Sequence, residues 1–395
     1  MDLFQKCKDF TLVKEVKEAG IYPYFHTLES KQDTVVEMEG ARKIMIGSNN
    51  YQGLTSDPRV IEASVKATKE FGTGCSGSRF LNGTTSLHIQ LEKELAEFLG
   101  KEDCVTMGSG FQTNLGVISA IAGRKDYIFC DKENHASIYD GCRLSYATMV
   151  RFNHLDYDEL ERKIQEVPET AGILIITDGI FSMTGDICDL PRLVEIKKKY
   201  GARLMVDDAH AFGVLGKTGA GTAEHFGLTD EVDLIYGTFS KSLASMGGYC
   251  GCSKEVAEFI RHTSRPFIFS ASITPASLAA TLESLRIIKA EPERISRLTE
   301  VAEYMRKLLR ERGIKFADSK APIIALFTYE QDKTLMVCKR LFEEGVYANP
   351  VLPPATPPGQ CLVRTTYTSS HTNEVLEEAA DIIAKVFEEF GLIEK

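Results

Sequence analysis

Short apolar runs alternate with helical patterns through the middle of the chain, between about residues 56 and 285. Several runs are continuously apolar, as expected for strands covered on both faces. The predicted strands are Asp103–Met107, Tyr127–Cys130, Met149–Phe152, Ile173–Thr177, Arg203–Val206, Leu234–Thr238 and Tyr249–Cys252. Between two of them, Leu190–Tyr200 has a helical pattern with Asp189 as candidate N-cap and Gly201 as its stop. This repeated order predicts an α/β fold with a mostly parallel sheet and helices on both faces.

The two ends of the chain have a different pattern. Residues 1–55 predict an N-terminal arm with one helix, Asp9–Ala19. Residues 286–395 predict a smaller α+β domain, in which an amphipathic helix over Ser296–Arg312 precedes a strand over Ile323–Phe327. We therefore expect three parts: this arm, a large domain over 56–285, and the C-terminal domain.

An apolar stripe marks the last helix of the chain. It is formed by Val375, Ala379, Ile382, Val386 and Phe390. Such a stripe can lie on a membrane surface or pack against its own domain. We favour packing, because the polar face of this helix is acidic.

Charge and composition exclude several classes of protein. The 395 residues carry 46 basic and 56 acidic side chains, a net charge of −10, which disfavours a nucleic-acid partner. The N-terminus lacks the apolar region of a signal peptide, and no run reaches the ~20 apolar residues of a membrane span. We expect a cytoplasmic protein, with peripheral association with the inner membrane left open. The ten cysteines are scattered, and the one close pair, Cys250 and Cys252, has no nearby histidine, so no metal site is expected.

The segment Gly72–Gly77 fits the glycine pattern of dinucleotide-binding proteins letter for letter. That pattern requires a strand directly before it and a helix directly after it. The preceding residues, Val60–Phe71, have a helical pattern instead. A nicotinamide-dependent enzyme is therefore disfavoured.

Lys241 lies among small and hydroxyl residues in the segment Gly237–Gly248, at the end of a predicted strand. A lysine that binds an aldehyde cofactor requires such surroundings, because the cofactor must reach its amine. The hydroxyls of Thr238 and Ser240 could hold a phosphate. The alternative is an exposed lysine in a glycine-rich loop.

Asp207 and His210 follow the predicted strand Arg203–Val206, at the edge where parallel sheets bind ligands. Pyridoxal 5′-phosphate requires a carboxylate beside its ring nitrogen, because a negative charge keeps that nitrogen protonated. His210 could bond the 3′-oxygen of the ring. Alone, the pair would fit a helix N-terminus equally well, but Lys241 at another strand end favours the cofactor.

Two further segments follow predicted strands. Gly108–Phe111 precedes helical sequence, so its backbone N–H groups would form a phosphate site at a helix start. Asn134–Ser137 contains His135, which could stack on the cofactor ring. A lone histidine is more often structural, so this assignment depends on the other residues.

Taken in order, these motifs resemble the α-oxoamine synthases, a family of fold-type I pyridoxal phosphate enzymes. The resemblance spans most of the chain and is specific. It rests on Asn49–Tyr51, Gly74–Arg79, Gly110–Phe111, Asn134–Ser137, Phe181–Asp186, Asp207–His210 and Gly237–Lys241. Within the family, the segments Ser78–Thr84, Gly237–Gly248 and Pro353–Pro357 are similar to those of members that condense L-serine with palmitoyl-CoA.

The resemblance implies a role for each matching residue. Lys241 would hold the cofactor covalently and move the α-proton, Asp207 would pair with the ring nitrogen, and His210 with the 3′-oxygen. His135 would stack on the ring and orient the amino acid. The other implied contacts are Gly110, Phe111 and Thr238 to the phosphate, Ser182 near the ring, Asn50 and Arg364 to the substrate, and Thr274 to the phosphate of a partner subunit.

The implied reaction joins L-serine to a long-chain acyl-CoA, with loss of CoA and CO₂, to give 3-ketosphinganine. Family members are homodimers with the active site at the subunit interface. Two alternatives stay open. Leu352 replaces an arginine found in some relatives, which leaves condensation of glycine with acetyl-CoA possible. A non-catalytic subunit of the same fold is disfavoured by Lys241, which such subunits tend to lose.

Overall fold

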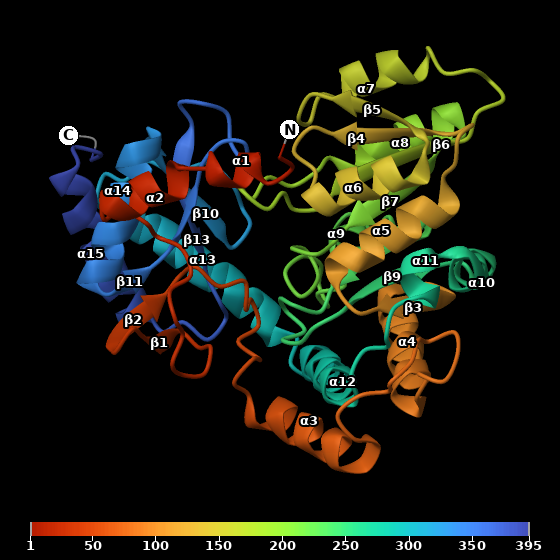
Figure 1. The fold of residues 1–395 in the computed structure, drawn as a ribbon, viewed down its shortest axis with the longest axis horizontal. Helices are drawn as coiled ribbons and strands as arrows, with labels where there is room; N and C mark the ends of the chain where they lie inside the picture. Colours follow the sequence, from red (N-terminus) through yellow and green to blue (C-terminus); the bar gives the residue numbers. More distant parts are fainter. Residues whose placement is uncertain (1, 394–395) are drawn as a thin grey trace.

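A sheet of seven strands forms the centre of the larger of two lobes (Figure 1). The computed structural model describes residues 2–393. The strands are β3 (Asp103–Met107), β4 (Tyr127–Asp131), β5 (Thr148–Phe152), β6 (Ile173–Asp178), β7 (Arg203–Asp207), β8 (Leu234–Thr238) and β9 (Gly248–Cys252). Every strand predicted in this region is confirmed, to within one residue at either end.

The order of the strands is β3-β9-β8-β7-β6-β4-β5. Neighbours from β8 to β5 run parallel, whereas β9 is antiparallel to both β8 and β3. The loop over residues 239–247 explains this exception, because a parallel crossover needs roughly a dozen residues or more. The predicted mostly parallel sheet is confirmed, with one antiparallel strand that the sequence pattern did not indicate.

Both faces of the sheet are buried by helices. Successive residues of one strand enter different cores: Ile128 packs in one cluster and Phe129 in another. The helices of this lobe are α3 (Pro58–Phe71), α4 (Ser86–Leu99), α5 (Gly110–Ile121), α6 (Ala136–Ser145), α7 (Tyr157–Ile164), α8 (Leu190–Tyr200), α9 (Thr222–His225), α10 (Lys254–Thr263), α11 (Arg265–Ile268) and α12 (Pro275–Ala290). The predicted ends of α8 are confirmed: the Asp189 side chain accepts a hydrogen bond from the backbone of Arg192, and Gly201 adopts a left-handed conformation.

The smaller lobe combines both ends of the chain (Figure 1). Its two sheets have the orders β1-β2-β11 and β10-β13-β12. The strands are β1 (Val35–Met38), β2 (Ala41–Met45), β10 (Ile323–Tyr329), β11 (Val346–Tyr347), β12 (Asn349–Val351) and β13 (Cys361–Thr366), and the helices are α13 (Glu293–Glu311), α14 (Gln331–Glu344) and α15 (Asn373–Glu389). Ile44 of β2 pairs with Val346 of β11, so part of the N-terminal arm belongs to this lobe.

The N-terminal helix is interrupted. Where one helix over Asp9–Ala19 was predicted, the structure has α1 (Gln5–Lys8) and α2 (Leu12–Glu18). Asp9 is the C-cap of α1, so the predicted start is wrong by three residues. Neither helix has a buried residue, which leaves little packing to hold them as one helix.

The last helix, α15, packs against the smaller lobe, as we expected. Its buried face is shifted by one position from the predicted stripe, because Ile383 is buried whereas Ile382 is only half-buried. The buried residues are Leu376, Ala379, Ala380, Ile383, Val386 and Phe387. Among residues 2–393, no helix is long and apolar enough to cross a membrane.

The shift in α15 can be tested with two neighbouring substitutions. Ile383→Ala should lower the free energy of unfolding by ~2–5 kcal/mol, because it leaves a cavity in the core. Ile382→Ala should cost about 1 kcal/mol or less, because less apolar surface is lost from the interior. Urea unfolding followed by circular dichroism compares the two, and equal losses would contradict the assigned face.

Candidate active site

A cavity of about 270 Å³ lies at the carboxyl ends of the central parallel strands. This volume is near the lower end of the ~300–1,000 Å³ typical of small-molecule sites. Among its lining residues are seven predicted site residues: Gly110, Phe111, His135, Asp207, His210, Thr238 and Lys241. Residues from well-separated parts of the chain meet there because parallel strands place their carboxyl ends at one edge of the sheet.

Lys241 lies in the loop that follows β8, and its amine reaches the cavity. Within the described chain, its Nζ has no hydrogen-bond or ion-pair partner. Burial lowers the pKa of Lys241 from 10.5 to about 8, the Asp207 charge opposes this, and Arg364 lowers it further. The amine is therefore partly neutral near physiological pH, as a nucleophile or proton acceptor must be.

Two carboxyl groups share the cavity with Lys241. Asp207 of β7 and Asp178 of β6 are paired in register on adjacent strands, and both are buried. Asp207 accepts hydrogen bonds from the Asn114 side chain and the Ala209 backbone, each at 3.0 Å. Burial raises the pKa of both carboxyls, and for Asp178 the neighbouring Asp207 raises it further. A bound cation would favour the ionised form of Asp207 again.

His210 is held by a buried tyrosine. Its Nδ1 lies 2.7 Å from the hydroxyl of Tyr51, which comes from the N-terminal arm. Burial, together with the charges of Lys241 and Arg364, lowers the pKa of His210 well below its usual value. His210 is therefore neutral and fixed in orientation at one wall of the cavity.

Arg364 and Ser182 lie beside this wall but are not part of it. The Nε of Arg364, on β13, donates a hydrogen bond to the carbonyl oxygen of Ser182. Its Nη2 donates to Oδ1 of Asn49 at 3.0 Å. Burial lowers the pKa of Arg364. The two lobes are thus joined by hydrogen bonds next to the site.

The start of α5 supplies backbone N–H groups to the cavity. Ser109 caps this helix by accepting a hydrogen bond from the backbone of Gln112, which confirms the predicted helix start. A Cβ on Gly110 would lie 2.7 Å from Oγ1 of Thr238, so glycine is required there. The backbone N–H groups of the first helical turn are thereby open to an anion in the cavity.

Two predicted contacts lie outside the cavity. The Asn50 side chain bonds to the Thr55 hydroxyl and the Leu54 backbone, and thereby closes a turn of its own loop. Thr274 is exposed and is the N-cap of α12. Their predicted contacts with substrate and with a partner's phosphate remain predictions.

Sequence reasoning missed Asp178, Asn114 and the role of Tyr51. Asp178 is the last residue of β6, so extending the predicted strand by one residue would have placed it at the ligand-binding edge. Asn114 follows one helical turn after Gly110 on α5. Tyr51 belongs to the motif Asn49–Tyr51, but its role could not be assigned, because its contact with His210 joins residues far apart in the chain.

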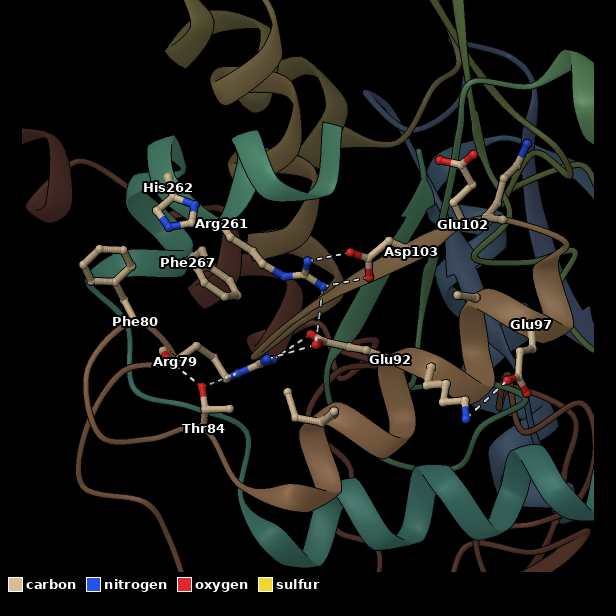
Figure 2. Close-up of a pocket in the computed structure, with 14 residues that line it drawn as sticks. Arg79, Phe80, Thr84, Glu92, Glu97, Glu102, Asp103, Arg261, His262 and Phe267 are labelled. Carbon is tan, nitrogen blue, oxygen red and sulfur yellow. Dashed lines mark hydrogen bonds and ion pairs between the residues drawn. The ribbon is translucent and has the colours of Figure 1, made fainter. Parts of the chain in front are cut away.

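A second, larger hollow of about 900 Å³ lies between α4, α10 and the start of β3 (Figure 2). Four of its charged groups form two pairs, which Figure 2 shows: Arg79 with Glu92, and Arg261 with Asp103. No free nucleophile comparable to Lys241 lies there. Helix α3 ends at Phe71, so the glycines from Gly72 follow a helix, as predicted, and do not form a dinucleotide site.

The thiols of Cys250 and Cys252 are free and buried. In the part of the chain that the structure describes, no group of three or more His, Cys, Asp or Glu side chains is placed to hold a metal ion.

Comparison with known proteins agrees with this geometry. The family model for aminotransferase class I and II matches residues 41–383. The chain belongs to that family. As an aminotransferase class I and II member, it is 48% identical to the serine palmitoyltransferase of Bacteroides thetaiotaomicron, over 99% of both chains. It is 43% identical to the 8-amino-7-oxononanoate synthase of Symbiobacterium thermophilum, over 97% of this chain and 98% of that one.

Solved structures show the same relationship. A structure of SPT (serine palmitoyltransferase) with PLP as an internal aldimine superposes with a TM-score of 0.96 at 33% identity, and all of both chains is covered. The expected fold-type I architecture of this aminotransferase family is therefore confirmed.

The opposing influences on Lys241 give a titration test. In protein freed of any bound aldehyde, acetic anhydride should label Lys241 with a midpoint of about pH 8. Asp207→Asn should lower this midpoint, because Asp207 stabilises the charged amine, and Arg364→Gln should raise it. Mass spectrometry of the peptide that contains Lys241 measures the label, and shifts in the same direction for both variants would contradict the electrostatic account.

Proposed function

We propose that this chain is a pyridoxal 5′-phosphate-dependent acyltransferase that condenses L-serine with palmitoyl-CoA to give 3-ketosphinganine, CoA and CO₂. The observation that carries the proposal is the half-buried, unpartnered amine of Lys241, which lines one cavity together with Asp207 and with Gly110 at the start of α5. The substrates follow from the serine palmitoyltransferases that are similar to the chain over nearly its full length.

The groups around the cavity fit this cofactor. An amine suits its aldehyde, a buried carboxylate suits its ring nitrogen, and a helix start with an obligatory glycine suits its phosphate. Lys241, Asp207 and Gly110 supply these groups, while Thr238 lies against Gly110. His135 also lines the cavity, where desolvation and the charge of Lys241 lower the pKa of its imidazole and favour the neutral ring.

When bound, the cofactor supplies an electron sink for negative charge at the α-carbon of an amino acid. Lys241 then serves as the base that removes the α-proton, since its pKa of about 8 allows a neutral amine near pH 7–8. Asp207 would pair with the ring nitrogen and favour its protonated form. In the overall reaction the α-carbon of serine loses its proton and bonds to the thioester carbon, and CoA leaves as its thiol. The carboxylate then leaves as CO₂, and a proton takes its place on the α-carbon.

Arg364 is suited to bind the carboxylate of the amino acid. Its guanidinium is held by Ser182 through Nε and by Asn49 through Nη2, and it also interacts with the buried hydroxyl of Tyr51. A buried guanidinium binds a carboxylate strongly, because a charged hydrogen bond is worth more away from water. The charge of Arg364 lowers the pKa of His210, which supports a position of the guanidinium near the proposed cofactor site.

The second candidate function is 8-amino-7-oxononanoate synthesis, favoured by relatives of that name at 40–43% identity. Condensation of glycine with acetyl-CoA is the third, because Leu352 does not exclude it. All three use the same catalytic groups and differ in the amino acid and acyl group that they accept. The identity of the product therefore decides among them.

The decisive experiment gives purified protein L-serine, glycine or L-alanine, each with palmitoyl-CoA, acetyl-CoA or pimeloyl-CoA. We expect a long-chain amino ketone, identified by mass spectrometry, from L-serine and palmitoyl-CoA alone. Lys241→Ala should lower kcat by at least ~10²–10⁴-fold, because it removes the proton-transfer group. Product from another pair only would overturn the proposed substrates and leave the cofactor assignment intact.

We further propose that the chain acts as a homodimer. Two loops that lie side by side expose large apolar side chains: Leu81 and Phe269 are 76% and 79% exposed. The loops are joined by a hydrogen bond from the Ser272 backbone to the carbonyl of Gly77. Exposed apolar groups gathered in this way indicate a contact surface. Thr274, next to this surface, would reach the phosphate of the partner's cofactor.

Light scattering coupled to size exclusion tests the dimer. The wild-type protein should have twice the 43.8 kDa mass of one chain. Leu81→Asp with Phe269→Asp should give the mass of one chain, because burying two carboxylates in an apolar contact is unfavourable. Met336→Asp, on α14, is the control and should remain dimeric. A wild-type mass of one chain would refute the dimer.

A further inference from the structure

His154 lies in the loop between β5 and α7 and does not line the cavity. Its Nδ1 is 3.0 Å from Oδ1 of Asp131, and its Nε2 is 3.4 Å from Oδ2 of Asp186. Oε2 of Glu133 lies 3.9 Å from the same Nε2. The imidazole therefore links the end of β4 to the loop that follows β6.

The Asp131 side of this link is rigid. Asp131 is fully buried, and its carboxylate also accepts hydrogen bonds from the backbone of Glu133 and Leu155, both at 2.8 Å. The chain continues from Asp131 to His135, whose ring lines the cavity. The anchor for His154 thus belongs to the same segment as a cavity wall.

The Asp186 side of the link is a short loop. The backbone N–H of Phe181 donates to the carbonyl of Asp186 at 2.9 Å, so residues 181–186 form a closed turn. The Phe181 ring packs edge-on against His154, with centroids 4.4 Å apart. This turn contains Ser182, whose carbonyl oxygen receives the Nε–H of Arg364.

His154 is a cation at physiological pH. Burial alone would lower its pKa, but hydrogen bonds to Asp131 and Asp186 and the charge of Glu133 raise the pKa from 6.5 to about 10. Because the folded-state pKa lies above the unfolded value, the stabilisation is complete below pH 6.5 and is lost as pH rises through 10. His154 is therefore a permanent ionic link at neutral pH and not a pH switch.

We infer that His154 is a positioning residue for substrate binding: by joining Asp131 to Asp186 it holds the 181–186 turn, and through Ser182 it orients Arg364 toward the amino-acid carboxylate. The inference rests on the proposed function, because it takes Arg364 as the carboxylate-binding group. It makes the affinity for the amino acid depend on a residue that does not line the cavity. The acyl-CoA substrate is not involved in this chain of contacts.

The variant His154→Gln tests the inference in the holoenzyme. Glutamine is neutral and cannot bridge both carboxylates as a cation. The KM for L-serine, and its dissociation constant from the absorbance of the bound cofactor, should rise about tenfold or more, because Arg364 is misplaced. The KM for palmitoyl-CoA and the kcat should change less than about threefold.

Hydrogen–deuterium exchange gives a readout that does not depend on activity. Amides of residues 181–186 should exchange faster in His154→Gln and in Asp186→Asn, which breaks the link at its other end. His225→Gln, at an exposed histidine of α9, is the control and should change neither exchange nor serine affinity. Unchanged exchange and unchanged serine affinity in both test variants would overturn the inference. If the two variants exchange faster but the wild-type protein does not condense serine, the proposed function is refuted and the structural link is retained.

Discussion

The side chains of Lys241, Asp178 and Asp207 line one cavity, where the two carboxyl groups are buried and the lysine is half-buried. Burial of a charge is costly unless it is paired, so each of these groups shifts its pKa toward the neutral form. A ligand with an electrophilic carbon and a basic ring nitrogen would lower the cost of burying these groups. Its carbon reacts with the amine, and its protonated nitrogen forms an ion pair with the carboxylate. The surrounding structure keeps these groups close together.

The sheet provides that arrangement through its parallel strands, and glycines permit the final approach. A Cβ on Gly248, where β9 begins, would lie 2.8 Å from Cα of Gly110, where α5 begins. The return of β9 antiparallel to β8 places these two glycines in contact and keeps the Lys241 loop short. The start of α5 therefore lies directly against the loop that contains the lysine, which is the arrangement needed by a ligand with both an aldehyde and a phosphate.

Features that depend on local sequence could be predicted, and those that depend on distant contacts could not. The parallel strands were recognised because continuous apolar runs are required where both faces are buried. The carboxyl-edge residues Asp207 and Lys241 followed from that placement. The burial of Ile383 in place of Ile382 depends on the angle at which α15 meets its lobe, which no periodicity specifies. The hydrogen bonds of Tyr51 to His210 and of Arg364 to Ser182 join residues more than a hundred positions apart.

The position of Arg364 indicates that the amino acid and the acyl chain are recognised in different places. It belongs to β13 of the smaller lobe, yet its Nε–H binds a backbone carbonyl of the larger lobe, so any residue at position 182 offers the same acceptor. The proposed site for the amino-acid carboxylate therefore lies at the junction of the lobes. A long acyl chain exceeds a cavity of 270 Å³ that must also hold a cofactor, so it lies along surfaces outside this cavity. Family members can therefore share every group around Lys241 and still differ in acyl substrate, which is why the motifs alone did not distinguish them.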